Sequence, residues 1–154
     1  MENISIKSED EILKEGTEFA GDVCYSGKYG QQVYNRPMEE GGEPITGLVY
    51  EKYSNGHIVY YCYYENGFKN GEYVGFYESS KVSRFCIMRD GQILGKNIEW
   101  YENGSVKSIE YCKHGVVISF EKWDEKGNLI NKKTEANDSE KKLLEKFESM
   151  YGAR

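Results

Sequence analysis

Histidines are the residues best suited to acid–base or nucleophilic chemistry, and the chain has only two, His57 and His114. Each lies beside a glycine that signals a turn, and the two turns fall on opposite edges of the predicted sheet. Strands of about eight residues, at about 3.3 Å per residue, would hold the two imidazoles more than ~20 Å apart. A nucleophile and its base cannot be assembled across that distance, so we expect no catalytic residues and no enzyme activity.

Carboxylates are plentiful, but three of them recur at matching turn positions, Glu78, Glu102 and Glu125. A repeated turn position is exposed to solvent. We therefore interpret these side chains first as features of the repeat, and only second as general acids or bases. Such a ridge of negative charge could steer a basic partner. The chain has no phosphate-binding loop, dinucleotide-binding signature or metal-ligand cluster, so we expect no cofactor and no metal.

The four cysteines have neither metal-ligand nor redox spacing. Cys24, Cys62, Cys86 and Cys112 form no CxxC pair, and they fit reduced thiols that are buried as small apolar groups. Cys62 and Cys86 lie one repeat apart, so one strand separates them. The resulting distance of about 10 Å is beyond the reach of a disulfide.

The composition is that of an acidic, tyrosine-rich protein. Its 154 residues suffice for one domain with a real core, and its 14 tyrosines compensate for a low hydrophobic content of 38%. The net charge is −6, from 26 acidic and 20 basic residues. Affinity for phosphates requires clustered Lys and Arg, so this balance argues against nucleic acid and membranes as partners and weakly favours a basic protein.

The beginning of the chain lacks the features of a signal peptide. Residues 1–14 are acidic and polar, where a signal peptide would be basic and then apolar, and no apolar run approaches ~18 residues. We therefore expect a cytoplasmic protein.

A repeat of 24 residues organises the middle of the chain. Glycines recur at this interval in two series, one at Gly47, Gly71 and Gly95 and one at Gly67, Gly91 and Gly115. Each unit holds two runs of strand-forming residues, and the Asn-Gly pairs at 55–56 and 103–104 predict tight type I′ hairpin turns. The pattern predicts an elongated antiparallel β-meander of about eight strands. A fourth unit ends one residue early at Gly127, which indicates a lost residue or a bulge after Gly115.

Three phrases within these units resemble a known family of repeats. Tyr63-Tyr-Glu-Asn-Gly67, Trp100-Tyr-Glu-Asn-Gly104 and Lys122-Trp-Asp-Glu-Lys-Gly127 are similar to the MORN-repeat variant of YwqK-like antitoxins and immunity proteins of bacteria. The resemblance covers roughly residues 47–133 and departs from the pattern at Ser79-Ser80, where Asn-Gly is expected. It implies a hairpin-repeat fold without a catalytic motif, and a role in binding a toxin.

The segments on either side of the repeats predict short helices. Ser8 and Glu11 form a capping box, and Gly16 stands where a helix would end. Strand-like runs and a Pro/Gly-rich loop then fill the chain up to residue 46. Asn137 to Ser139 offer caps for a C-terminal helix that we expect to cover one end or one face of the sheet, with a partner-binding helix as the alternative. We thus expect one domain, 1–154, with an N-terminal part (1–46), the repeats (47–133) and a helical tail (134–154).

The alternation of side chains sorts the strands into two faces. We expect one face to be the core, because it collects Leu48, Tyr50, Tyr61, Tyr63, Val74, Phe76, Phe85, Ile87, Ile98, Trp100, Ile109 and Tyr111. We expect the other to be exposed and to bind a partner, because it is an aromatic row interleaved with charges, namely Glu51, Tyr53, Tyr60, Tyr73, Tyr77, Arg84, Glu99, Tyr101, Ser108 and Glu110. Glu78 and Glu102 add the acidic turn edge. The same tyrosines could instead stabilise the sheet by cross-strand contact alone, at some 0.2–1 kcal/mol per pair.

These features favour a non-enzymatic protein-binding module, an immunity protein or antitoxin that masks a cognate toxin. The alternative is a MORN-like scaffold that holds two proteins or meets a membrane. An exposed edge strand could also pair with a second copy to form a homodimer.

Overall fold

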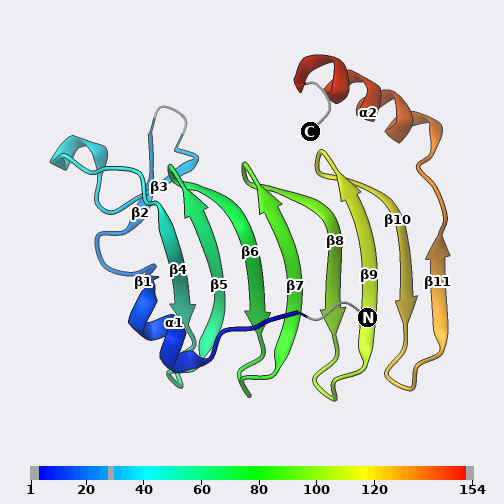
Figure 1. The fold of residues 1–154 in the computed structure, drawn as a ribbon, viewed down its shortest axis with the longest axis horizontal. Helices are drawn as coiled ribbons and strands as arrows, with labels where there is room; N and C mark the ends of the chain where they lie inside the picture. The colour runs from blue at the N-terminus through cyan, green and yellow to red at the C-terminus, as the bar shows by residue number, and fades with distance from the viewer. Residues whose placement is uncertain (1–3, 28–29, 152–154) are drawn as a thin grey trace.

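The computed structural model describes residues 4–27 and 30–151, and it is dominated by one open nine-stranded sheet (Figure 1). Neighbouring strands from β4 to β11 follow one another along the chain and pair antiparallel, so the predicted meander of eight strands is confirmed. A short β1 (Thr17–Glu18) adds in parallel to β4. The meander strands are β4 (Gly47–Lys52), β5 (Ile58–Glu65), β6 (Phe68–Phe76), β7 (Val82–Arg89), β8 (Gln92–Trp100), β9 (Val106–Lys113), β10 (Val116–Trp123) and β11 (Leu129–Lys133).

The turns at the two edges of the meander differ in type, and the sequence-based assignment of the type I′ turns is wrong. The tight-turn edge, at the top of Figure 1, has two-residue loops at 66–67, 90–91 and 114–115. Both residues of each loop have positive φ, as a type I′ turn requires. The wide-turn edge, at the bottom, comprises turns 53–57, 77–81, 101–105 and 124–128. There Gly56 has positive φ and Asn55 does not.

The missing residue of the fourth unit is located in β10. Strand β6 carries two more residues than its partner β5 beside Gly71, and β8 carries two more than β7 beside Gly95. The corresponding bulge of β10 against β9 contains one extra residue, Ile118. The fourth unit has therefore lost a residue from this bulge, and its final hairpin repeats the register of the others.

The tyrosines of the wide-turn edge connect each hairpin to the next. The hydroxyl of Tyr53 donates to the carbonyl of Phe76 at 2.6 Å, and that of Tyr77 donates to the carbonyl of Trp100 at 2.5 Å. The hydroxyl of Tyr101 continues the series to the last hairpin. This tyrosine column thus stabilises the stacking of the repeats, because each hydroxyl satisfies a carbonyl of its neighbour.

We expect Tyr77→Phe to lower the free energy of unfolding by about 1 kcal/mol, because it leaves the Trp100 carbonyl without the hydroxyl that donates to it. Urea unfolding measures the change. Tyr111→Phe is the matched control, since the Tyr111 side chain is exposed and lies outside the tyrosine column. Equal unfolding midpoints for the two variants would contradict the role of the column.

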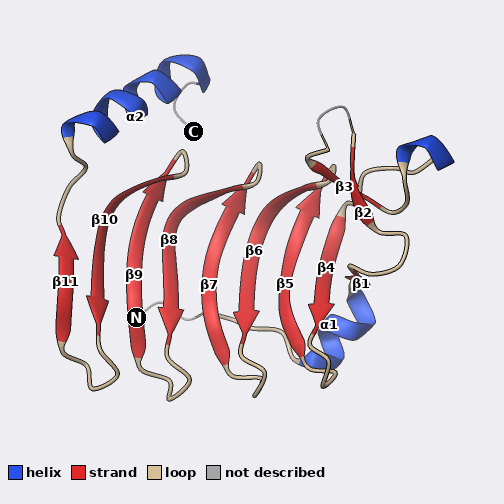
Figure 2. Cartoon of the chain, turned by 180° about the vertical axis from the view of Figure 1, so that it is seen from behind, coloured by secondary structure: helices blue, strands red, loops and turns tan. Residues whose placement is uncertain are grey.

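Residues before the meander cover both faces of the sheet. The N-terminal arm, residues 4–16, crosses the face turned toward the viewer in Figure 1, which we call the arm face. Residues 17–46 cover the opposite side, the groove face, which is turned toward the viewer in Figure 2. They form the two-stranded sheet of β2 (Cys24–Ser26) and β3 (Gln32–Tyr34) and the 3-10 helix η1 (Met38–Glu40).

Helix α1 (Glu9–Glu15) fixes the arm to the sheet. Its capping box joins Ser8 and Glu11, and its cap at the C-terminal end is Gly16, both as predicted. Ile12 is fully buried against the arm face. At the wide-turn edge, Glu9 Oε1 lies 2.9 Å from Ser80 Oγ and 2.8 Å from His57 Nδ1. These hydrogen bonds hold the pKa of Glu9 below its usual range. The ionised carboxylate therefore connects the helix to turns 77–81 and 53–57.

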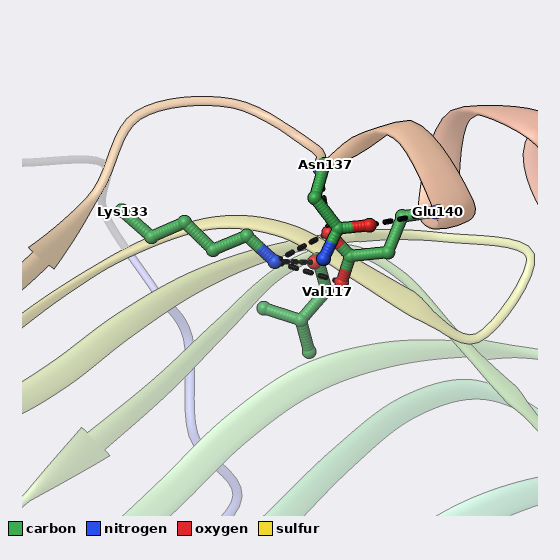
Figure 3. A network of polar contacts seen from close by, with 4 residues as sticks. All are labelled: Val117, Lys133, Asn137 and Glu140. Atoms are coloured by element: carbon green, nitrogen blue, oxygen red, sulfur yellow. Dashed lines mark hydrogen bonds and ion pairs between the residues drawn. The ribbon is translucent and has the colours of Figure 1, made fainter.

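The C-terminal helix α2 (Asp138–Tyr151) lies above the tight-turn edge, next to β10 and β11 (Figure 1). Lys133 Nζ donates to the carbonyl of Val117 at 3.0 Å and pairs with both oxygens of Glu140 at 2.7 Å (Figure 3). Asn137 and Glu140 cap each other through their side chains and backbone amides. The predicted helix therefore begins at its expected cap, and residues 152–154 of the predicted tail lie outside the described residues.

Candidate functional site

The arm face is a core mainly where the arm covers it, and Ile98 on β8 is also buried, as predicted. Leu48, Tyr50, Tyr61 and Val74 are buried beneath Ile6 and Ile12, as predicted for this face. Farther along the same face, two predicted core residues are exposed, Ile87 at 36% and Tyr111 at 44%. Between Ile6 and Trp100 lies a hollow of about 630 Å³. Ile4, Ile6, Val82 and Trp100 give it an apolar side, and the wide-turn residues Ser80, Lys81 and 101–104 border it as well, so the predicted partner residues Tyr101 and Glu102 line this hollow.

The groove face is a second core at its β4–β6 end, so the predicted exposure of Tyr60 is wrong. Tyr60 is only 7% exposed, and it belongs to an apolar cluster with Val33 and Ile45 of the N-terminal part. Burial raises the pKa of the Tyr60 hydroxyl. The alternation pattern assigned Tyr60 to the correct face, but it could not reveal that residues 17–46 pack on that face.

Beyond this cluster, the groove face opens into a groove of about 560 Å³ over β6 to β9. Three polar side chains cross its floor on successive strands. Arg84 Nε donates to Asn97 Oδ1 at 2.9 Å, and Asn97 Nδ2 donates to Glu110 Oε1 at 2.9 Å. Asn97 is 4% exposed, so the ladder is built into the sheet. Arg84 and Glu110 were both predicted for the partner-binding face, and the structure brings them together.

An aromatic platform holds the cations at one end of the groove. The rings of Tyr60 and Tyr73 are stacked, with centroids 5.2 Å apart. Lys69 Nζ lies 5.3 Å from the Tyr73 centroid, and the Arg84 guanidinium lies 5.4 Å from it. Cation–π attraction therefore favours two positive charges on one tyrosine ring.

Carboxylates line the other end. Glu99 and Glu110 border both this groove and a smaller hollow that continues toward β11. Glu99 accepts a 3.3 Å hydrogen bond from Ser108, which is buried, so the predicted exposure of Ser108 is wrong. Cations thus occupy one end of the groove and carboxylates the other, and two further lysines, Lys107 and Lys122, border the smaller hollow.

The other predicted partner residues lie outside the groove. Tyr53, Tyr77 and Tyr101 belong to the wide-turn edge, where their hydroxyls are occupied by backbone carbonyls. Glu78 and Glu102 are exposed at that edge. Glu51 is half-buried on β4 and pairs across the sheet with Tyr60.

Two groove residues escaped the sequence analysis, Lys69 and Asn97. Asn97 lies two residues from Glu99 on the same strand, so strict alternation would have placed it on the groove face. Lys69 follows a tight turn next to the β6 bulge. Because the bulge adds two residues, it keeps the parity of the alternation, and Lys69, four residues before Tyr73, would also have been placed on the groove face by strict alternation.

Groups that could do nucleophilic or metal chemistry are separated or buried. All four cysteines are free, and burial raises the pKa of Cys62 to about 12 and that of Cys112 to about 11. The two histidines lie in turns at opposite edges of the sheet, His57 in a wide turn and His114 in a tight one. Within residues 4–27 and 30–151, no three His, Cys, Asp or Glu side chains form a metal-binding group. No helix in these ranges is long and apolar enough to span a membrane.

Fold and groove together define an open, repeat-built sheet that presents a polar, half-exposed surface. The chain is 39% identical over 121 residues to the immunity protein YwqK of Bacillus subtilis (strain 168), a match that covers 79% of this chain and 77% of that protein. The chain therefore belongs to the YwqK family of immunity proteins. Neither a protein-family profile nor a solved structure matches it, so the resemblance of the hairpins to MORN repeats stays a prediction.

Proposed function

We propose that this chain is a non-enzymatic, cytoplasmic immunity protein that neutralises a cognate bacterial toxin by binding it directly. The observation that carries the proposal is the 39% identity to an immunity protein. The groove supports it, because a half-exposed tyrosine, an arginine and carboxylates are side chains that recognise proteins. The binding surface that we propose consists of the groove, with Arg84, Glu99 and Glu110, the wide-turn edge, with Tyr53, Tyr77, Tyr101, Glu78 and Glu102, and Glu51 outside the groove on β4.

Co-expression tests this proposal directly. The chain should restore growth of cells that express the toxin encoded by a neighbouring gene, and the two proteins should purify as a complex. Failure to rescue growth from every adjacent candidate, together with no recoverable complex, would overturn the proposal.

We expect the wide-turn edge to steer a basic toxin toward the groove. The double variant Glu78→Lys/Glu102→Lys should slow association about tenfold at low salt, because it reverses two exposed charges beside the binding surface. Stopped-flow or surface-plasmon measurements give this rate. Glu39→Lys/Glu40→Lys is the matched control, since it makes the same charge change on the exposed 3-10 helix of the N-terminal part. Equal association rates for the two double variants would contradict steering.

The homodimer stays a prediction, with β11 as the strand at which a second copy would add. Four of its five residues, Leu129 to Lys132, are exposed. The strand pairs with β10 on one side, and the other side carries no strand of the described chain. Lys132 donates its backbone amide to Asn131 Oδ1 at 2.9 Å, so one donor of this edge is already satisfied.

A further inference from the structure

The groove carries two cations and two carboxylates that are not paired with each other. Lys69, Arg84, Glu99 and Glu110 all line it. Within the part of the chain that the structure describes, none of the four has an oppositely charged partner within 4.0 Å. Half-buried charges lose hydration, which hydrogen bonds and ring contacts offset in part, and an opposite charge that binds offsets it further.

The separation of charge is unusual because the strand pairing favours a salt bridge. Arg84 lies directly opposite Glu99 on the neighbouring strand, and opposite charges at such positions normally attract each other. Instead, the Arg84 side chain bonds Asn97 and lies over the Tyr73 ring. The guanidinium is thus held away from the nearest carboxylate.

Asn97 lies between the Arg84 guanidinium and the Glu110 carboxylate and bonds both of them. Its carbonyl oxygen accepts from Arg84, and its amide nitrogen donates to Glu110. This arrangement fixes the amide in one orientation in a nearly buried position. One side chain therefore bridges a cation on β7 and a carboxylate on β9, two strands away.

We infer that the groove binds a segment of the toxin that carries both an acidic and a basic side chain on one face. The acidic group docks between Lys69 and Arg84 over the Tyr73 ring, and the basic group docks between Glu99 and Glu110. This inference rests on the proposed function. It expects the toxin surface that meets the groove to carry both acidic and basic side chains, and not basic side chains alone.

Variants that each remove one charge from the groove distinguish a partner of mixed charge from a purely basic or purely acidic one. Lys69→Gln and Glu99→Gln leave the ladder through Asn97 intact, and we expect each to raise the Kd of the purified toxin complex at least tenfold. Arg84→Gln and Glu110→Gln should act in the same direction. Lys14→Gln and Glu39→Gln, both at exposed sites outside the groove, are controls that should change the Kd less than twofold. Circular dichroism verifies that every variant is folded.

Any other pattern of Kd values among the groove variants would overturn the inference. A purely basic partner would bind Lys69→Gln more tightly and Glu99→Gln more weakly, and a purely acidic partner would do the reverse. A change below twofold for all four groove variants would show that the toxin binds elsewhere, while the proposed function would stand. Absence of any complex with the unmodified chain would instead overturn the proposed function.

Discussion

Tyr61→Ala is expected to lower the free energy of unfolding by about 3–5 kcal/mol, the range for removing a buried aromatic ring. Tyr61 is 0% exposed, and its ring packs against Phe76 with centroids 6.1 Å apart. Its hydroxyl also accepts the backbone amide of Lys7 at 3.0 Å, so the side chain connects the arm to the sheet. The substitution should therefore open a cavity and loosen the arm. The urea midpoint should fall by about 2 M.

Two control variants separate the causes of this loss. Tyr61→Phe keeps the ring and removes only the hydroxyl, so it should cost about 1 kcal/mol. Tyr111→Ala removes the same side chain from the same face at a position that the arm does not cover, and it should cost less than ~1 kcal/mol. If Tyr111→Ala proved as damaging as Tyr61→Ala, the arm would not be what makes this face a core.

This contrast shows what side-chain alternation can and cannot predict. Tyr61 and Tyr111 were both assigned to the core face, and they do share a face of the sheet. A repeat pattern shows which residues point together, but the cover comes from residues outside the repeats. Here residues 4–16 cover one face and residues 17–46 cover the other, and both cover mainly the β4–β7 end. Tyr60 was assigned wrongly for the same reason.

The candidate site was predictable in part. Arg84, Glu99 and Glu110 follow from strand alternation, because the hairpin register of β7 to β9 is regular at these positions. The bridging role of Asn97 was not predictable. Arg84 can either pair directly with Glu99 or bond Asn97, which in turn bonds Glu110, and the sequence does not decide between the two. That choice is made by the geometry of Tyr73 and Asn97 around the guanidinium, which composition and spacing do not encode.

Local sequence also failed to predict the turn type. The tetrapeptide Tyr-Glu-Asn-Gly occurs at 64–67 and at 101–104. In the first copy, Asn66 and Gly67 both have positive φ and form a type I′ turn. In the second copy, only Gly104 has positive φ, and the turn is a wide one closed by Tyr101 and Ser105. The same four residues thus form two turns, and the positions of the flanking strands decide between them.

Gly67 lies in the tight turn on which the N-terminal part docks, and Gly67→Ala should be much more damaging than the same change at Gly91. Both glycines are the second residue of a type I′ turn, with φ of +83° and +81°. At Gly91 an added Cβ would meet no atom within 4 Å, so the cost is that of the left-handed backbone alone, about 1–2 kcal/mol. At Gly67 it would lie 2.8 Å from Gln32 Cβ and 3.0 Å from the Val33 carbonyl oxygen.

The additional loss at Gly67 should be about 1–3 kcal/mol, as for an overpacked core. Strand β3 cannot yield cheaply, because Val33 donates its amide to the Gly67 carbonyl at 2.9 Å and Gly67 donates its own amide to Ile45 at 2.8 Å. Hydrogen exchange gives the sharpest readout. The amides of Val33 and Gly67 should exchange faster in Gly67→Ala and at unchanged rates in Gly91→Ala. Equal unfolding midpoints and equal exchange in the two variants would show that docking of residues 17–46 on this turn adds no stability, and that the cover of Tyr60 is held by its apolar contacts alone.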